Sequence, residues 1–161
     1  MRKPVEWLVN EYQKNLFAAS YAICGNAEDA RDAVQDTFIR YYTSKKEFND
    51  DEHIRAWLLR VAVNRAKDMN RSFWRRNTCG EYSEELANTP VFENEEESDL
   101  FDAVMALPEK YRIVIHLFYY EDMEIKEISK VLGISESNVK VRLSRGRRML
   151  KDRLKEEWLD D

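Results

Sequence analysis

Residues 79–102 form an acidic segment that divides the chain into two pieces. The segment holds nine Asp or Glu side chains and no Lys or Arg, and Pro90 lies near its middle. A segment with high net charge and few apolar residues cannot bury enough surface to fold by itself. The sequence therefore predicts a flexible acidic linker at 79–102, between an N-terminal domain at 1–78 and a C-terminal domain at 103–161.

The charge of the chain is distributed unevenly, and this changes what its total implies. The 161 residues carry 26 Lys or Arg against 31 Asp or Glu, a net charge of −5 that by itself argues against a nucleic-acid partner. Counted by segment, the charge is +3 before the acidic segment, −9 within it and +1 after it. Basic side chains outnumber acids by seven to one in residues 54–78 and by eight to one in residues 138–155. Both stretches are therefore candidates for binding a polyanion.

Composition favours helices and excludes several classes of protein. Only 4 Gly and 3 Pro leave few tight turns, so we expect an all-α fold of two small helical domains. The chain has no run of 18 apolar residues that would predict a membrane span, and its N-terminus lacks the apolar core of a signal peptide. Two cysteines cannot form a disulfide framework, which indicates a reducing, cytoplasmic setting.

The N-terminal domain is predicted to contain three helices, at residues 5–24, 27–42 and 54–76. Asn26, followed by Asp29, is typical of the N-cap of the second helix. This helix buries a stripe of apolar side chains, and its opposite face is acidic but includes one apolar residue, Ile39. Such a face is either simply solvated or a surface for another protein, and the apolar residue favours the second interpretation. The buried stripe consists of Ala30, Val34, Phe38 and Tyr41, and the acidic face of Asp29, Asp32, Gln35, Asp36 and Ile39.

The third helix presents a face with the side-chain types that bind single-stranded DNA. Cations neutralise phosphates, amides hydrogen-bond base edges, and an aromatic ring stacks on an unpaired base. A solvated basic face is the alternative, and this stripe alone does not decide between them. The face consists of Arg60, Asn64, Lys67, Arg71 and Trp74, opposite the apolar positions Ile54, Leu58, Ala62, Met69 and Phe73.

The C-terminal domain contains a helix-turn-helix pattern. A short helix from Ile125 is expected to end at Gly133, which tolerates a left-handed cap, and Ser135 is expected to cap the next helix. In DNA-binding units of this type, the second helix enters the major groove. Its exposed side is predicted to carry Lys140, Val141, Ser144 and Arg145, followed by Arg147, Arg148 and Lys151 in positions suited to phosphates. Gly146 is unusual within a helix and falls on the buried side, where close packing would explain it.

Taken together, these motifs resemble bacterial RNA polymerase sigma factors of the extracytoplasmic-function (ECF) group in the sigma-70 family. Residues 29–38 (DARDAVQDTF) resemble the region that binds core polymerase, and residues 53–68 (HIRAWLLRVAVNRAKD) resemble the region that melts the promoter and reads the −10 element. Residues 107–112 (LPEKYR), the helix-turn-helix and residues 144–150 (SRGRRML) resemble the domain that reads the −35 element. The resemblance covers essentially the whole chain in the correct order.

The resemblance implies a protein that directs core RNA polymerase to promoters and is not an enzyme. The implied partners are the beta and beta-prime subunits of core RNA polymerase, promoter DNA, and an anti-sigma factor, which in this family is often membrane-bound. By position, the polymerase contacts are Asp32, Gln35 and Asp36, with Ile39 beside them; the −10 contacts are Arg60, Asn64, Lys67 and Arg71, with Trp74 on the same face; the −35 contacts are Lys140, Val141, Ser144 and Arg145, with Arg148 beyond them.

Two other classes of protein fit the sequence less well. A self-sufficient helix-turn-helix regulator would usually dimerise, yet no dimerisation segment is apparent and the N-terminal domain would have no role. An enzyme acting on nucleic acid would need a reactive site, but His53 and His116 are isolated and there is no Gly-rich phosphate loop. We therefore expect no metal, no cofactor and no small-molecule substrate.

Overall fold

The computed structural model describes the backbone of residues 1–76 and 95–159, and the side chains within residues 1–70 and 99–155. The described residues form seven α-helices and no strand, which confirms the predicted all-α class. The chain divides into two compact units, Met1–Thr89 and Pro90–Asp161. None of the described helices combines the length and apolar character needed to cross a bilayer.

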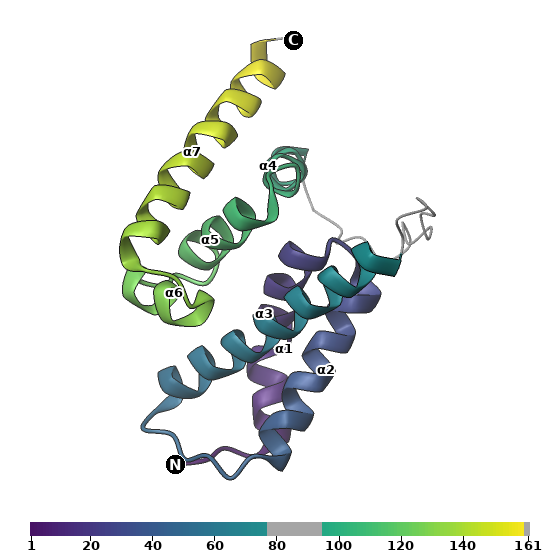
Figure 1. The fold of residues 1–161 in the computed structure, drawn as a ribbon, viewed down its shortest axis with the longest axis vertical. Helices are drawn as coiled ribbons and strands as arrows, with labels where there is room; N and C mark the ends of the chain where they lie inside the picture. The colour runs from purple at the N-terminus through teal and green to yellow at the C-terminus, as the bar shows by residue number, and fades with distance from the viewer. Residues whose placement is uncertain (77–94, 160–161) are drawn as a thin grey trace. The chain divides into compact units, whose positions relative to one another are not determined.

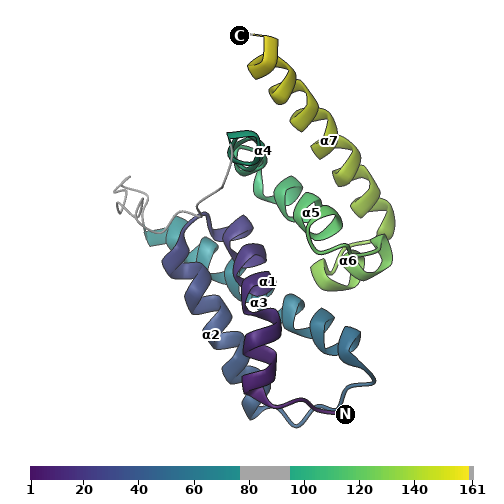
Figure 2. The same cartoon turned by 180° about the vertical axis from the view of Figure 1, so that it is seen from behind.

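The first unit is a bundle of three helices that pack against one another. They are α1 (Val5–Cys24), α2 (Ala27–Thr43) and α3 (Asp51–Arg76). Figures 1 and 2 show them side by side from opposite directions. The predicted stripe of α2 is buried as expected, with Ala30 and Tyr41 at most 1% exposed. On α3 the buried face is wider than predicted, because Leu59, Val63 and Ala66 also contribute to the core.

Local signals set the ends of these helices. Gly25 ends α1 in the left-handed conformation, with φ at 73°. Asn26 then caps α2, because its side-chain oxygen accepts a hydrogen bond from the backbone N–H of Asp29 at 2.8 Å. The third helix begins at Asp51, three residues earlier than predicted, because the Asp50 carboxylate accepts a hydrogen bond from the His53 N–H at 2.8 Å.

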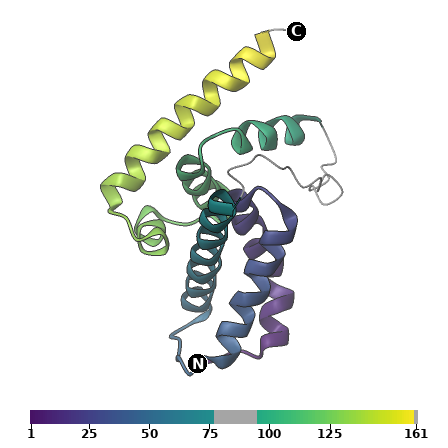
Figure 3. The same cartoon turned by 45° about the vertical axis from the view of Figure 1, so that its right-hand side comes forward.

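The second unit contains four helices. They are α4 (Glu95–Met105), α5 (Glu109–Tyr119), α6 (Ile125–Leu132) and α7 (Glu136–Leu159). The core of this unit includes Val114 and Leu117 of α5 and Val139 of α7, all completely buried. Figure 3 shows the long α7 rising from the end of the short α6.

The start of α4 differs from the expectation that residues 79–102 form one linker. Residues 95–102 are helical, although they belong to the acidic segment. The reason is the apolar sequence that follows the segment, where Ala103, Val104 and Leu107 are buried within the unit. The remaining expectation, for residues 79–94, lies outside the described residues.

Candidate functional site

The turn between α6 and α7 has the geometry of a helix-turn-helix. Gly133 takes a left-handed conformation with φ at 68°, and its N–H donates to the Ser129 carbonyl. The Ser129 hydroxyl donates to the carbonyl of Ile134, which fixes the path of the turn. Ser135 caps α7 by accepting a hydrogen bond from the Asn138 N–H at 3.1 Å. The predicted cap residues at both sides of the turn are therefore confirmed.

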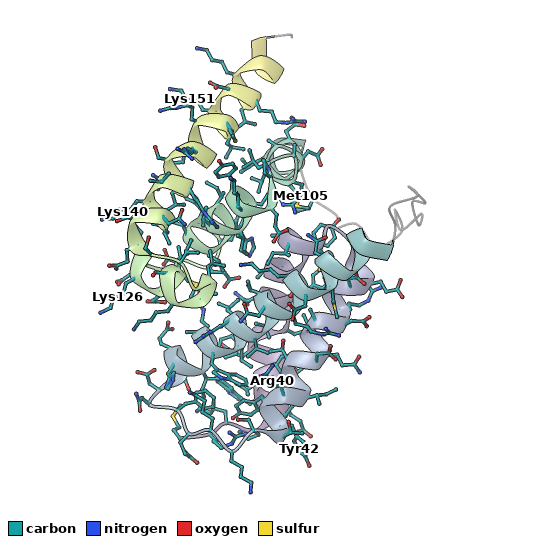
Figure 4. The ribbon with its side chains drawn as sticks, in the orientation of Figure 1. Arg40, Tyr42, Met105, Lys126, Lys140 and Lys151 are labelled. Carbon is teal, nitrogen blue, oxygen red and sulfur yellow. The ribbon has the colours of Figure 1, made fainter. Side chains whose placement is uncertain are left out.

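The exposed side of α7 carries the predicted −35 residues. Val141 is 44% exposed, and the others in the group are exposed as well, while Val139 and Leu143 are buried on the opposite side. Figure 4 shows Lys140 and Lys151 projecting from the side of α7 that faces away from α5. The whole predicted group lies on this surface: Lys140, Val141, Ser144, Arg145 and Arg148.

Arg145 is held by the preceding helix. Its side chain hydrogen-bonds the hydroxyl of Tyr111 at the start of α5. Burial by itself would raise the pKa of Tyr111, but the hydrogen bonds from Arg145 and Lys110 and the charges of both cations bring it below its ordinary value. The ammonium of Lys110 also lies 5.1 Å from the centre of the Tyr111 ring. The basic character of this end of the unit thus extends from α7 onto α5.

Close packing explains why Gly146 stands within α7. A Cβ at this position would lie 3.2 Å from Cγ1 of Ile115 and 3.5 Å from Cβ of Tyr111. Most Cβ contacts are longer than 3.2 Å, so a side chain here would require Ile115 to shift if α5 is to stay this close. The glycine therefore brings the predicted DNA-binding helix against the helix that precedes the helix-turn-helix.

The first unit presents the predicted acidic face on α2. Asp32 and Gln35 are exposed, Asp36 is partly exposed, and the apolar Ile39 is 54% exposed. Tyr42 is 75% exposed at the same end of α2, where Figure 4 labels it near Arg40. The predicted acidic face did not include this residue. Its spacing of three residues from Ile39 is the signal that would have identified it.

A salt bridge joins this face to α3. The Arg65 Nε donates to Asp36 at 2.7 Å, and both side chains are almost half exposed. Nothing in the sequence predicts this pair, because the two residues are 29 positions apart. Asp36 is therefore accessible but already has a cationic partner within the unit.

The predicted −10 face of α3 is described only in part. Arg60 and Asn64 are exposed, one turn apart, and Lys67 is partly buried. The side chains of Arg71 and Trp74 lie outside the described residues. Within residues 1–76 and 95–159, the structure holds no group of three or more His, Cys, Asp or Glu that could bind a metal ion.

Comparison with known proteins identifies the family. The family model "Sigma-70 region 2" matches residues 8–77, and "Sigma-70, region 4" matches residues 98–150. SigL, an ECF RNA polymerase sigma factor of Mycobacterium tuberculosis, is 32% identical over 157 residues that span 92% of this chain and 88% of SigL. This chain belongs to the ECF sigma factors of the sigma-70 family. It therefore directs promoter-specific transcription initiation by RNA polymerase.

Other similar proteins agree with this family. SigW, an ECF sigma factor of Bacillus subtilis, is 29% identical over 92% of this chain and 88% of its own length. The structure of CnrH in complex with the cytosolic domain of CnrY is 26% identical and has a TM-score of 0.66, covering 94% of this sigma factor and 87% of CnrH. The sigma factor RpoE of Bartonella quintana, solved with the anti-sigma factor NepR, has the same fold, with a TM-score of 0.78 at 22% identity over 93% of this chain and 96% of that one.

Proposed function

We propose that this sigma factor uses its two units for separate contacts. The first unit binds core polymerase through the acidic face of α2 and the −10 element through α3, and the second reads the −35 element through α7. The observation that carries the proposal is the exposed basic side of α7, which follows a helix-turn-helix with caps on both sides of its turn. The proposed residues are Asp32, Gln35, Asp36 and Ile39 for polymerase; Arg60, Asn64, Lys67, Arg71 and Trp74 for the −10 element; and Lys140, Val141, Ser144, Arg145 and Arg148 for the −35 element.

The mechanism we propose is binding, without a catalytic step of its own. Docking on polymerase holds both DNA-binding surfaces on one enzyme. Once one surface binds the promoter, the other is held near its DNA element at a high effective concentration. Strand opening is then favoured because cations and an aromatic side chain of α3 capture unstacked bases. This mechanism needs no metal, cofactor or small-molecule substrate. Since the RNA polymerase it serves is intracellular, we place its action in the cytoplasm.

Regulation by an anti-sigma factor is part of the proposal. The RpoE structure contains the anti-sigma factor NepR, and the CnrH structure contains the cytosolic domain of CnrY. The exposed apolar side chains on α2 and α7, Ile39 and Val141, support a protein partner that covers both DNA-binding and polymerase-binding faces. We propose such a partner for this sigma factor, tethered to the membrane or free.

Run-off transcription with core polymerase over a pool of genomic promoters tests the function. We expect the purified sigma factor to direct transcription from a defined set that shares −10 and −35 elements. Arg145→Ala should reduce initiation at promoters that depend on the −35 element, and Arg71→Glu should reduce open-complex formation while core polymerase still binds. Absence of promoter-specific transcripts from the wild-type chain would overturn the proposal.

A gel shift without polymerase separates this function from that of a self-sufficient regulator. A sigma factor should bind its promoters tightly only together with core polymerase. Tight, sequence-specific binding by the purified chain alone would instead indicate an independent helix-turn-helix regulator.

A further inference from the structure

Arg147 lies at the edge of the proposed DNA-binding side of α7, where the sequence predicts a phosphate contact but does not show what would hold the side chain in place. It is three residues from Ser144, four from Lys151 and seven from Lys140, which places all of them on neighbouring positions of one side of the helix. Its side chain is exposed. A cation at this position points along the flank of a helix that enters the major groove, where the backbone phosphates lie.

The end of α5 fixes the direction of this arginine. The Arg147 Nε donates a hydrogen bond to the hydroxyl of Tyr119 at 2.6 Å. The guanidinium carbon also lies 5.2 Å from the centre of the Phe118 ring and 5.5 Å from that of Tyr119, within the range of cation–π attraction. Three contacts from two consecutive aromatic residues thus hold a side chain that would otherwise sample many rotamers.

These contacts leave the charge of Arg147 available. In the described part of the chain, its partners are a phenol and two aromatic faces, none of them a carboxylate. Only the Nε–H is used by Tyr119, so the terminal N–H groups of the guanidinium still present the planar fork that matches a phosphate. The Tyr119 hydroxyl accepts this hydrogen bond and keeps its own proton for a second acceptor.

The arrangement has a counterpart on the other side of Gly146. There the side chain of Arg145 donates a hydrogen bond to the hydroxyl of Tyr111, which lies at the opposite end of the same α5 helix. Because Gly146 lets α5 pack closely, the two tyrosines of α5 reach the arginines that precede and follow the glycine. One helix therefore orients cations along both flanks of the proposed −35 surface.

We propose that Arg147 binds a backbone phosphate beside the −35 element and that Tyr119 is the residue that positions its guanidinium. This inference rests on the proposed −35 role of α7 and adds two residues to it. A phosphate contact contributes affinity without reading sequence, and each one lost lowers the salt dependence of binding by about 0.9 in the slope of log Kobs against log salt concentration.

The test measures holoenzyme binding to a duplex that carries the −35 element of a promoter found by run-off transcription and that ends before the −10 element. Binding is measured between about 50 and 200 mM salt, the range in which phosphate contacts dominate the change. Four variants are compared with wild type: Arg147→Ala, Arg147→Lys, Tyr119→Phe and the double variant Tyr119→Phe/Arg147→Ala. Tyr120→Phe is the matched control, since Tyr120 is as exposed as Tyr119 (54% against 55%) and loses the same hydroxyl.

Arg147→Ala should lower the magnitude of the slope by about 0.9, and Arg147→Lys should largely retain it because the charge remains. Tyr119→Phe should weaken binding about fivefold to tenfold, which is the effect expected for losing one typical hydrogen bond. It should have no further effect in the Arg147→Ala background, and Tyr120→Phe should bind like wild type. Arg147→Ala and Tyr119→Phe should weaken binding to −35 sequences and to unrelated sequences equally, because a phosphate contact carries no sequence information.

Two results would overturn the inference. An unchanged salt-dependence slope in Arg147→Ala would show that Arg147 makes no phosphate contact. If Tyr119→Phe weakens binding equally with and without Arg147, Tyr119 does not position that arginine. If the wild-type holoenzyme fails to bind the duplex, the proposed −35 function of α7 is wrong. If wild type binds and the variants bind equally well, only the inference about Arg147 and Tyr119 is wrong.

Discussion

Gly146 shows how one residue can be unfavourable for its own helix and favourable for the packing around it. Within a helix, glycine costs about 1 kcal/mol relative to alanine. At this position, a Cβ would press on Ile115, which is only 2% exposed and has little room to move. The cost of overpacking a filled core is about 1–3 kcal/mol, which exceeds the gain in helix propensity.

We therefore expect Gly146→Ala to destabilise the second unit by about 1 kcal/mol. Native-state hydrogen exchange of the amides in α5 and α7 measures this free energy directly. Ser144→Ala is the control, because Ser144 is exposed two residues earlier on the same helix and its replacement only improves helix propensity. Greater protection in Gly146→Ala than in wild type would show that α5 can retreat from the helix.

Asn26 stabilises the first unit through a cap that the sequence predicted. Its side chain accepts from the Asp29 N–H at 2.8 Å and donates to the Asp29 carboxylate at 3.0 Å. Asn26→Ala removes both bonds and should lower the free energy of unfolding by about 1 kcal/mol. Urea unfolding followed by tryptophan emission measures the change, since Trp7 and Trp57 lie in this unit.

Asn10→Ala provides the comparison for the cap. Asn10 is exposed within α1, so alanine there should leave stability unchanged or raise it slightly. If both asparagine variants shift the urea midpoint equally, the cap of α2 makes no special contribution.

At the level of elements, the exposed salt bridge between α2 and α3 is expected to contribute little to stability. Arg65 and Asp36 are 46% and 43% exposed, and pairs of this kind contribute about 0–1 kcal/mol. We expect Asp36→Asn to change the free energy of unfolding by less than about 1 kcal/mol and to weaken binding to core polymerase about tenfold, because a contact across that interface is lost. Surface-immobilised core polymerase and chemical denaturation provide the two measurements.

Two variants sharpen the interpretation of Asp36. Glu28→Gln removes the same charge from the same helix outside the proposed polymerase contacts, and we expect it to bind core polymerase like wild type. Arg65→Gln breaks the salt bridge but keeps the carboxylate. A loss of core affinity in Arg65→Gln as large as in Asp36→Asn would assign the effect to the salt bridge, and the proposed contact would be wrong.

At the level of the whole molecule, we expect the net charge of −5 to disfavour indiscriminate DNA binding by the free sigma factor. The acidity is concentrated in residues 79–102, while α7 and α3 carry the basic faces. A chain of this kind combines DNA-binding surfaces with an overall charge that repels a polyanion. We therefore expect tight binding to depend on polymerase, which would bring those surfaces to the promoter.

Removing part of this acidity should increase non-specific DNA binding. The variant replaces Glu81, Glu84, Glu85 and Glu93 by Gln, which raises the net charge from −5 by four units. We expect the affinity of the free chain for a random duplex to rise several-fold at about 50 mM salt and the difference to narrow at about 200 mM, because salt screens the repulsion. Fluorescence anisotropy with a labelled duplex measures both. A difference that is independent of salt would exclude an electrostatic cause.

Much of the local structure follows from the sequence alone. The periodicity of apolar residues predicts the three helices of the first unit and the two helices of the helix-turn-helix. The Asn26, Gly133 and Ser135 caps are confirmed by their hydrogen bonds or backbone conformation. The exposed sides of α2 and α7 follow from the same periodicity. These features depend on residues no more than a few positions apart, so helix geometry is enough to predict them.

Only the tertiary structure decides which distant residues meet. The helical start of α4 within the acidic segment depends on burial against its own unit, which composition does not reveal. Arg65 with Asp36, and Arg147 with Tyr119, are separated by 29 and 28 residues, and their pairing depends on how two helices cross. The sequence by itself therefore determined most of the helices and their exposed faces. The packing of the helices decided where α4 begins and which charged side chains are held in place, because contacts between helices depend on crossing geometry and not on local periodicity.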